Sequence, residues 1–180
     1  MWISCRCNWL LLWASEGVPV PAKIGLSLAH PASPLPGEEV SNAMARALKD
    51  ICVLIVEDNV RNYALLARLL SFMGVKQAEW KRSGWHVLEF AQDAMPHVDL
   101  ILLDIHLPEE DGYEVLARLR ADDHFRNTRI VAVTADITSS NLSRAQTAGF
   151  DGFLAKPINV DLFPDQIRRI LDGESVWDLG

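Results

Sequence analysis

Cysteine is scarce in this chain, which has only Cys5, Cys7 and Cys52 among its 180 residues. These three form neither the spaced, even-numbered set of a disulfide framework nor the paired C-x-x-C pattern of a zinc site. Cys52 falls within an apolar run and is best explained as a small core residue. Because a reducing compartment suits such a chain, we expect it in the cytoplasm.

Positive charge and long apolar runs are also scarce. Lysine and arginine number 17 against 24 acidic residues, for a net charge of −7, so the chain lacks the basic footprint of a nucleic-acid-binding protein. The apolar stretch 9–14 follows Arg6 but is short for an export signal. No run of about 20 apolar residues follows it to span a membrane. We expect neither nucleic acid nor membrane as a partner.

The first 43 residues differ from the rest, because they hold five of the nine prolines and show no sustained apolar period. We expect translation to start at Met44, directly before the first predicted strand. A disordered extension is the second alternative and an export signal the third. We assign residues 50–172 to one domain, as the length favours, and residues 173–180 to a short tail.

Four short apolar runs without alternation are typical of strands buried on both faces of a parallel sheet. They cover 51–56, 100–103, 130–133 and 153–155. A more polar strand is expected over 77–80, and apolar residues at helical spacing predict helices around 65–73, 87–91, 113–119, 142–148 and 162–171. Five β-α units in series predict an α/β fold. We expect a doubly wound, flavodoxin-like (βα)5 sheet of five parallel strands in the order 2-1-3-4-5.

Polar side chains follow or end the four apolar runs. They are Glu57, Asp58, Asp104, Thr134 and Lys156. Taken singly, the acids could be helix caps, Thr134 a strand former and Lys156 a solvated surface residue. Ligands bind at the carboxyl ends of the strands in an open parallel sheet, however, so we expect all five side chains to converge. Three carboxylates with an amine and a hydroxyl suit Mg²⁺ and a phosphoryl group.

Pro157 directly follows Lys156. An X-Pro bond in a tight turn can be cis. A cis bond here would aim the side chain of Lys156 back into the crevice.

In their order and spacing these segments resemble the receiver domain of two-component response regulators. The matching segments are 53–59, 102–108 with Asp111-Gly112, 133–135 and 156–157. The resemblance spans roughly residues 50–172. The chain is similar in particular to single-domain regulators of the cell-polarity type and to receivers of hybrid kinases, which share a Glu-Asp-Asn opening and a second asparagine, here Asn59 and Asn62.

The resemblance implies a metal site. Asp58 and Asp104 would hold Mg²⁺, and Glu57 would assist through water. The backbone carbonyl of His106 would complete the protein ligands.

The resemblance also implies a signalling switch. Asp104 would accept a phosphoryl group from a phosphohistidine of a sensor kinase or phosphotransfer protein, and Thr134 and Lys156 would contact the phosphoryl oxygens. Phe153 occupies the position of the switch aromatic residue. The output would pass to another protein through the face of the helix near 142–148, the strand at 153–155 and the helix at 162–171. Such a protein is a phosphoacceptor regulator rather than an enzyme, although it takes part in its own phosphorylation and dephosphorylation.

Three other readings of the sequence are weaker. A hydrolase of the haloacid-dehalogenase type is expected to carry a second acid two residues after its nucleophile, where this chain has His106. A binding module that has lost phosphorylation would not need the intact acids and Lys156. A DNA-binding regulator would need more than the eight residues at 173–180 that follow the last predicted helix.

The side chain of His106 allows two interpretations. By resemblance it overhangs Asp104, and Asp136 would lie on the other side of the same opening. The alternative is that His106 points to solvent and has no role. The segment 80–85 is atypical for the family and leaves the register of the second strand open.

Overall fold

The structure, a computed structural model, describes residues 48–177 apart from 96 and 109. The predicted extension over residues 1–43 and the predicted start at Met44 lie outside the described residues. Among the residues that are described, no helix is long and apolar enough to cross a membrane.

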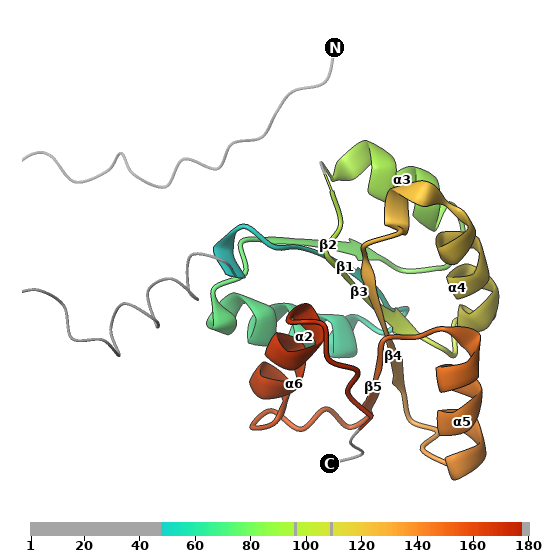
Figure 1. Cartoon of the computed structure of the whole chain (residues 1–180). Coiled ribbons are helices and arrows are strands. Elements are labelled where there is room, and N and C mark those ends of the chain that lie inside the picture. Colours follow the sequence, from blue (N-terminus) through green and yellow to red (C-terminus); the bar gives the residue numbers. More distant parts are fainter. Residues whose placement is uncertain (1–47, 96, 109, 178–180) are drawn as a thin grey trace, which may run out of the picture. The chain divides into compact units, whose positions relative to one another are not determined.

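Five strands form one parallel sheet in the order β2-β1-β3-β4-β5 (Figure 1). This confirms the predicted doubly wound fold and its strand order. The strands are β1 (Cys52–Val56), β2 (Gln77–Lys81), β3 (Leu100–Asp104), β4 (Arg129–Thr134) and β5 (Gly152–Ala155).

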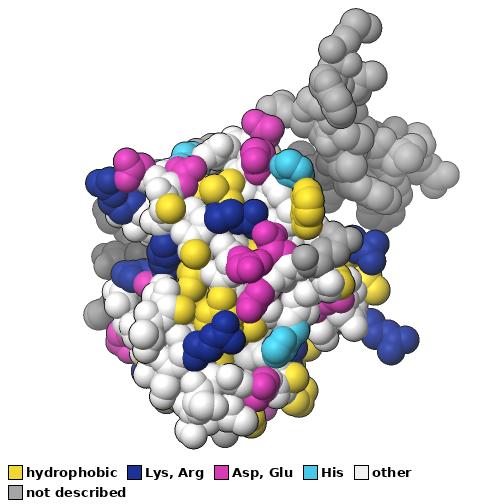
Figure 2. Space-filling view, turned by 90° about the vertical axis from the view of Figure 1, so that its right-hand side faces the viewer, with side chains coloured by type: hydrophobic (Ala, Val, Ile, Leu, Met, Phe, Trp, Pro, Cys, Tyr) yellow, Lys and Arg dark blue, Asp and Glu magenta, His cyan; other side chains and the backbone are white. Residues whose placement is uncertain are grey.

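Helices connect the strands and cover both faces of the sheet. They are α2 (Val60–Met73), α3 (Val87–Ala94), α4 (Gly112–Ala121), α5 (Ser139–Ala148) and α6 (Phe163–Leu171), with a short 3₁₀ helix η1 (Asp123–Phe125) before β4. Helices α2 and α6 lie on one face, and α3, α4 and α5 lie on the other (Figure 1). On the α3–α5 side, acidic, basic and apolar side chains lie next to one another (Figure 2).

The central strands are apolar throughout because both of their faces are covered. Successive side chains of a strand point to opposite faces. Cys52, Leu54 and Val56 of β1 therefore pack in the core under α3 and α4, while Val53 and Ile55 pack in the core under α2 and α6. All five residues are fully buried.

Capping residues set the start of α2 and the ends of α2 and α5, and they help to position the loops next to the strands. Asn59 caps α2, because its side chain accepts a hydrogen bond from the backbone N–H of Arg61. Gly74 and Gly149 end α2 and α5 with φ of 101° and 100°, a left-handed conformation that favours glycine. The cap at Asn59 fixes the chain directly after the acidic pair that follows β1.

Part of the short tail after α6 returns to the sheet. The backbone N–H of Phe153 donates to the carbonyl of Val176 at 2.8 Å, and Val176 is fully buried. The segment thus pairs with β5 at the edge of the sheet.

Candidate functional site

Four loops meet at the carboxyl edge of the sheet. Asp104 and Thr134 are the last residues of β3 and β4. Glu57 directly follows β1, and Lys156 directly follows β5. Because all the strands are parallel, their carboxyl ends lie at one edge of the sheet, as the sequence predicted.

The three acids form a compact cluster. One carboxylate oxygen from each of Glu57, Asp58 and Asp104 lies within 4.8 Å of the other two. Glu57 and Asp104 are only 1% and 5% exposed, whereas Asp58 is half-buried. Three carboxylates this close repel one another unless a cation lies among them. An oxygen-only donor set that is open on one side fits Mg²⁺, which binds carboxylates and keeps several waters.

Lys156 provides a positive charge from within the protein. Its Nζ donates to Asp104 Oδ2 at 2.6 Å and lies 2.7 Å from Glu57 Oε2. The second contact is an ion pair without hydrogen-bond alignment, so buried Glu57 Oε2 has no hydrogen-bond partner among the described residues. Burial disfavours the ammonium, but the contacts with the two carboxylates outweigh it and raise the pKa of Lys156. The Lys156-Pro157 bond is cis, which is the form that the sequence allowed and that would aim Lys156 into the crevice.

Glu57 is held in place by Asn62 of α2 and by Asn59, which caps that helix. Asn62 Nδ2 donates to Glu57 Oε1 at 2.9 Å, and the backbone N–H of Asn59 donates to the same oxygen at 3.3 Å. The second asparagine of the opening motif therefore orients this carboxylate.

Trp80 on β2 holds the backbone of the acidic loop, which sequence reasoning missed. Its indole Nε1 donates to the carbonyl of Glu57 at 2.8 Å, and its ring stacks on Tyr63 of α2 at 4.2 Å between centroids. The signal that could have indicated this contact was a tryptophan at the end of the polar edge strand, within the segment 80–85 that is atypical for the family.

Asp104 is oriented through both of its oxygens. Oδ1 accepts from the backbone N–H of His106 at 2.9 Å, while Oδ2 accepts from Lys156. The Asp104 carboxylate is thus fixed at the carboxyl end of β3, close to the other acids.

Thr134 is buried beside this cluster, at 1% exposure. Its Oγ1 accepts from the backbone N–H of Asp136 at 3.1 Å, which leaves the hydroxyl proton available to another acceptor. The structure shows no hydrogen bond between Thr134 and Asp104 among the described residues.

His106 and Asp136 line the same opening. Both border a pocket of about 150 Å³ together with Thr134, Tyr113 and Arg144. The side chains of His106 and Asp136 are exposed. The structure thus places His106 and Asp136 at one pocket with Thr134. A position of the His106 side chain over Asp104, and an effect of that side chain on the chemistry, stay predictions.

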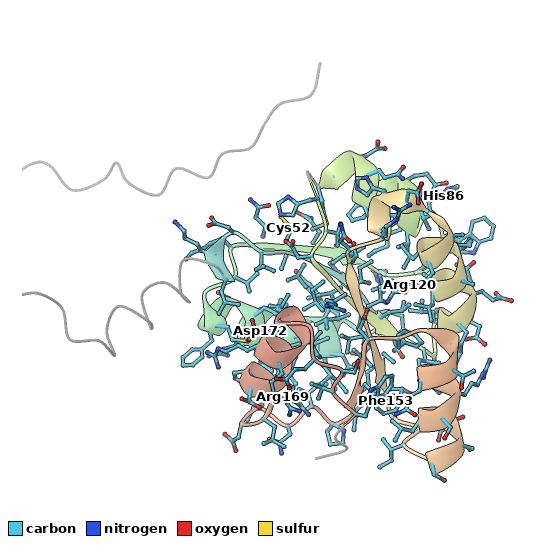
Figure 3. The ribbon with its side chains drawn as sticks, viewed as in Figure 1. Cys52, His86, Arg120, Phe153, Arg169 and Asp172 are labelled. Carbon is cyan, nitrogen blue, oxygen red and sulfur yellow. The ribbon has the colours of Figure 1, made fainter. Side chains whose placement is uncertain are left out.

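Phe153 is fully buried on the α5 side of the sheet (Figure 3). It belongs to the core cluster that also contains Ala145 of α5. The ring therefore lies inside the molecule in this structure.

The sequence matches the family model of the response regulator receiver domain over residues 53–168. The polar-differentiation response regulators DivK of Brucella anthropi and Brucella ovis are each 37% identical over 119 residues, which cover 66% of this chain and 94% of theirs.

Solved structures agree with this match. A response regulator from Chloroflexus aurantiacus superimposes with a TM-score of 0.62 at 26% identity, covering 68% of this chain and 98% of that one. The chemotaxis protein CheY4 of Vibrio cholerae shares the fold, with a TM-score of 0.61 at 24% identity over 67% of this chain and 98% of that one. With these matches and the strand-end cluster together, this chain belongs to the response regulator receiver domain family of two-component signalling.

Proposed function

We propose that this protein is a phosphorylation-operated switch in which Asp104 accepts the phosphoryl group. The observation that carries the proposal is the burial of the Asp104 carboxylate together with its charged neighbours. Asp104 is nearly buried at the end of β3, its Oδ2 lies 2.6 Å from Lys156 Nζ, and an oxygen of each of two further acids lies within 4.8 Å.

The reaction is a transfer between two nucleophiles. A carboxylate oxygen of Asp104 attacks the phosphorus of a phosphohistidine on a sensor kinase or phosphotransfer protein. The new P–O bond forms as the P–N bond breaks, and the imidazole leaves with the electron pair and takes up a proton. The product on Asp104 is an acyl phosphate.

The residues around Asp104 supply charge and positioning. Lys156 offsets negative charge on the transferring group, and the free hydroxyl proton of Thr134 can be donated to a phosphoryl oxygen. Bound Mg²⁺ would neutralise charge on the carboxylates and on the phosphoryl oxygens. We propose that Asp58, Asp104 and the carbonyl of His106 hold the ion directly. Glu57, which Asn62 orients, would assist through water.

The signal would leave through the face of α5, β5 and α6. When Thr134 turns toward the phosphoryl group, the packing around Phe153 changes. Since the Phe153 ring is already buried in this structure, the switch is a shift in population between the buried ring and an outward one. The output partner is another protein, and we place the pathway in the cytoplasm, without nucleic acid or membrane as a direct partner.

Labelling tests the proposal. The full chain is incubated with radiolabelled acetyl phosphate and Mg²⁺, and Asp104→Asn is expected to abolish the labelling. Asp93→Asn makes the same change at an exposed site on α3 and is expected to be labelled like the natural protein. Stoichiometric labelling of Asp104→Asn would refute the assignment.

A further inference from the structure

A second group of metal-ligating side chains lies at the opposite edge of the sheet from Asp104. Cys52 is the first residue of β1 (Figure 3), and His97 and Asp99 lie in the loop that leads into β3. The sulfur of Cys52, an imidazole nitrogen of His97 and a carboxylate oxygen of Asp99 all lie within 4.8 Å of one another. We propose that these three residues bind a transition-metal ion of the Zn²⁺ class, at a site separate from the phosphoryl site.

The donor atoms already stand close to the spacing that such an ion needs. His97 Nε2 lies 3.1 Å from Asp99 Oδ2, and Cys52 Sγ lies 2.7 Å from Gln77 Oε1. Tetrahedral Zn²⁺ binds its ligands at about 2.0–2.3 Å, which places neighbouring donors roughly 3.3–3.8 Å apart. Small side-chain shifts would therefore complete the site, with the Gln77 oxygen as a fourth ligand.

The kinds of donor atom separate this site from the acidic cluster. A thiolate, an imidazole and a carboxylate are all ligands of Zn²⁺, whereas Mg²⁺ prefers oxygen. The cluster around Asp104 offers only carboxylates. The two ends of the sheet thus favour different cations.

The site is anchored on one side and open on the other. Cys52 is fully buried, and its backbone N–H donates to Asp99 Oδ2 at 2.8 Å, so these two ligands are held together. The side chains of His97 and Asp99 are 54% and 32% exposed, which gives an ion access from solvent.

Burial, followed by the nearby charge of Asp99, raises the pKa of Cys52. A bound cation acts in the opposite direction and favours the thiolate, so the metal–sulfur bond forms as the S–H proton is released to solvent. Detection of a metal–thiolate bond would therefore demonstrate metal binding. In the alternative, Asp99 binds no metal and only accepts a hydrogen bond from the backbone at the start of β1.

Co²⁺ serves as the spectroscopic probe. The test uses the full chain with Cys5→Ser and Cys7→Ser, so that Cys52 is its only cysteine, and Mg²⁺ in excess to occupy the acidic cluster. Co²⁺ titration is expected to produce a near-ultraviolet thiolate-to-cobalt charge-transfer band and the visible bands of a four-coordinate ion. Zn²⁺ is expected to displace both.

Four further variants locate the site. In that background, Cys52→Ser is expected to lose the charge-transfer band. His97→Ala, at an exposed position, is expected to weaken Co²⁺ binding at least about tenfold, the smallest loss usual for a disturbed metal site. His124→Ala on η1 and Asp58→Asn in the acidic cluster are expected to leave the band unchanged. No charge-transfer band at saturating Co²⁺, or equal affinity in His97→Ala, would overturn the proposal.

Discussion

Lys156 places its amine against two buried carboxylates, 2.6 Å from Asp104 Oδ2 and 2.7 Å from Glu57 Oε2. In Lys156→Ala those carboxylates would face each other without a counter-charge. We expect the free energy of unfolding to fall by roughly 1–3 kcal/mol without Mg²⁺. The loss should be smaller with Mg²⁺, because the cation replaces the missing charge.

Urea denaturation followed by circular dichroism measures this difference. Lys76→Ala removes an exposed lysine and should change stability by less than about 0.5 kcal/mol. If Lys156→Ala lost the same stability with and without Mg²⁺, a shared role of Lys156 and the cation in charge neutralisation would be wrong.

The raised pKa of Lys156 also predicts a pH dependence. A group with a higher pKa in the folded state stabilises the fold fully at pH values below its unfolded pKa, about 10.4 for lysine. That contribution is lost as the pH rises through the raised folded-state pKa. The stability difference between the natural protein and Lys156→Ala should therefore stay constant from about pH 7 to about pH 10 and shrink above that range. A difference that already shrinks below about pH 9 would contradict this assignment.

We expect Trp80 to affect the Mg²⁺ affinity although it is not a metal ligand. Trp80→Phe keeps an aromatic ring for Tyr63 to stack on but loses the hydrogen bond to the Glu57 carbonyl. Loss of one hydrogen bond costs about 1 kcal/mol, so Mg²⁺ should bind roughly fivefold more weakly by calorimetry. Tyr63→Phe, which keeps the ring pair, should bind Mg²⁺ normally. Unchanged affinity in Trp80→Phe would show that this bond does not position the site.

The site residues that lie at the ends of strands could be predicted from the sequence. A charged residue directly after a buried strand lies at the sheet edge whatever the details of packing, as Glu57 and Lys156 do. Trp80 was not predictable, because its contact depends on the register of an edge strand. The structure pairs Trp80 with Ile55 across β1 and β2, and no sequence pattern specifies that register in a polar strand.

At the scale of elements, Asp151 ties together the amino ends of the strands and a helix. Its carboxylate lies 2.5 Å from Arg120 of α4 and 3.0 Å from Arg129 of β4, and it accepts from the backbone N–H of Ile130 at 2.8 Å. Figure 3 shows Arg120 near the sheet on the α4 side. The loop before β5 is thus joined to both α4 and β4.

Loss of this carboxylate should destabilise the fold. Asp151→Ala leaves Arg120 and the N–H of Ile130 without this acceptor, so we expect a loss of about 1–3 kcal/mol in urea denaturation. Asp123→Ala removes an exposed partner of Arg126 and should cost less than about 1 kcal/mol. Equal stability of the two variants would mean that Asp151 makes no more than a surface contribution.

The sequence predicted the elements better than it predicted their ends. Continuous apolar runs identified the four strands β1, β3, β4 and β5, because burial on both faces leaves a strong pattern, and helical spacing identified the helices. The edge strand β2 is more polar and half exposed, so it was predicted without such a run. Helix α2 begins at Val60 rather than near Leu65, since its first turn combines exposed Val60 and Arg61 with half-buried Asn62 and Tyr63 and carries no apolar period. The pairing of Val176 with β5 was missed because a single buried residue beyond a helix has no periodic signal.

At the scale of the whole domain, the two edges of the sheet differ in chemistry. The carboxyl edge gathers acids and Lys156, while the amino edge gathers Cys52, His97 and Asp99. A packed core separates the two edges. A metal ion that binds only the folded protein at the amino edge would raise the free energy of unfolding. It need not change the phosphoryl site.

The identity of the phosphorylated residue tests the central claim most directly. The full natural chain is phosphorylated with acetyl phosphate and Mg²⁺ and then reduced with borohydride, which converts an aspartyl phosphate to homoserine. Peptide mass spectrometry then locates the product. We predict homoserine at position 104 alone. Homoserine at position 58, or a phosphoryl group that stays on a serine, threonine or histidine after reduction, would contradict the account.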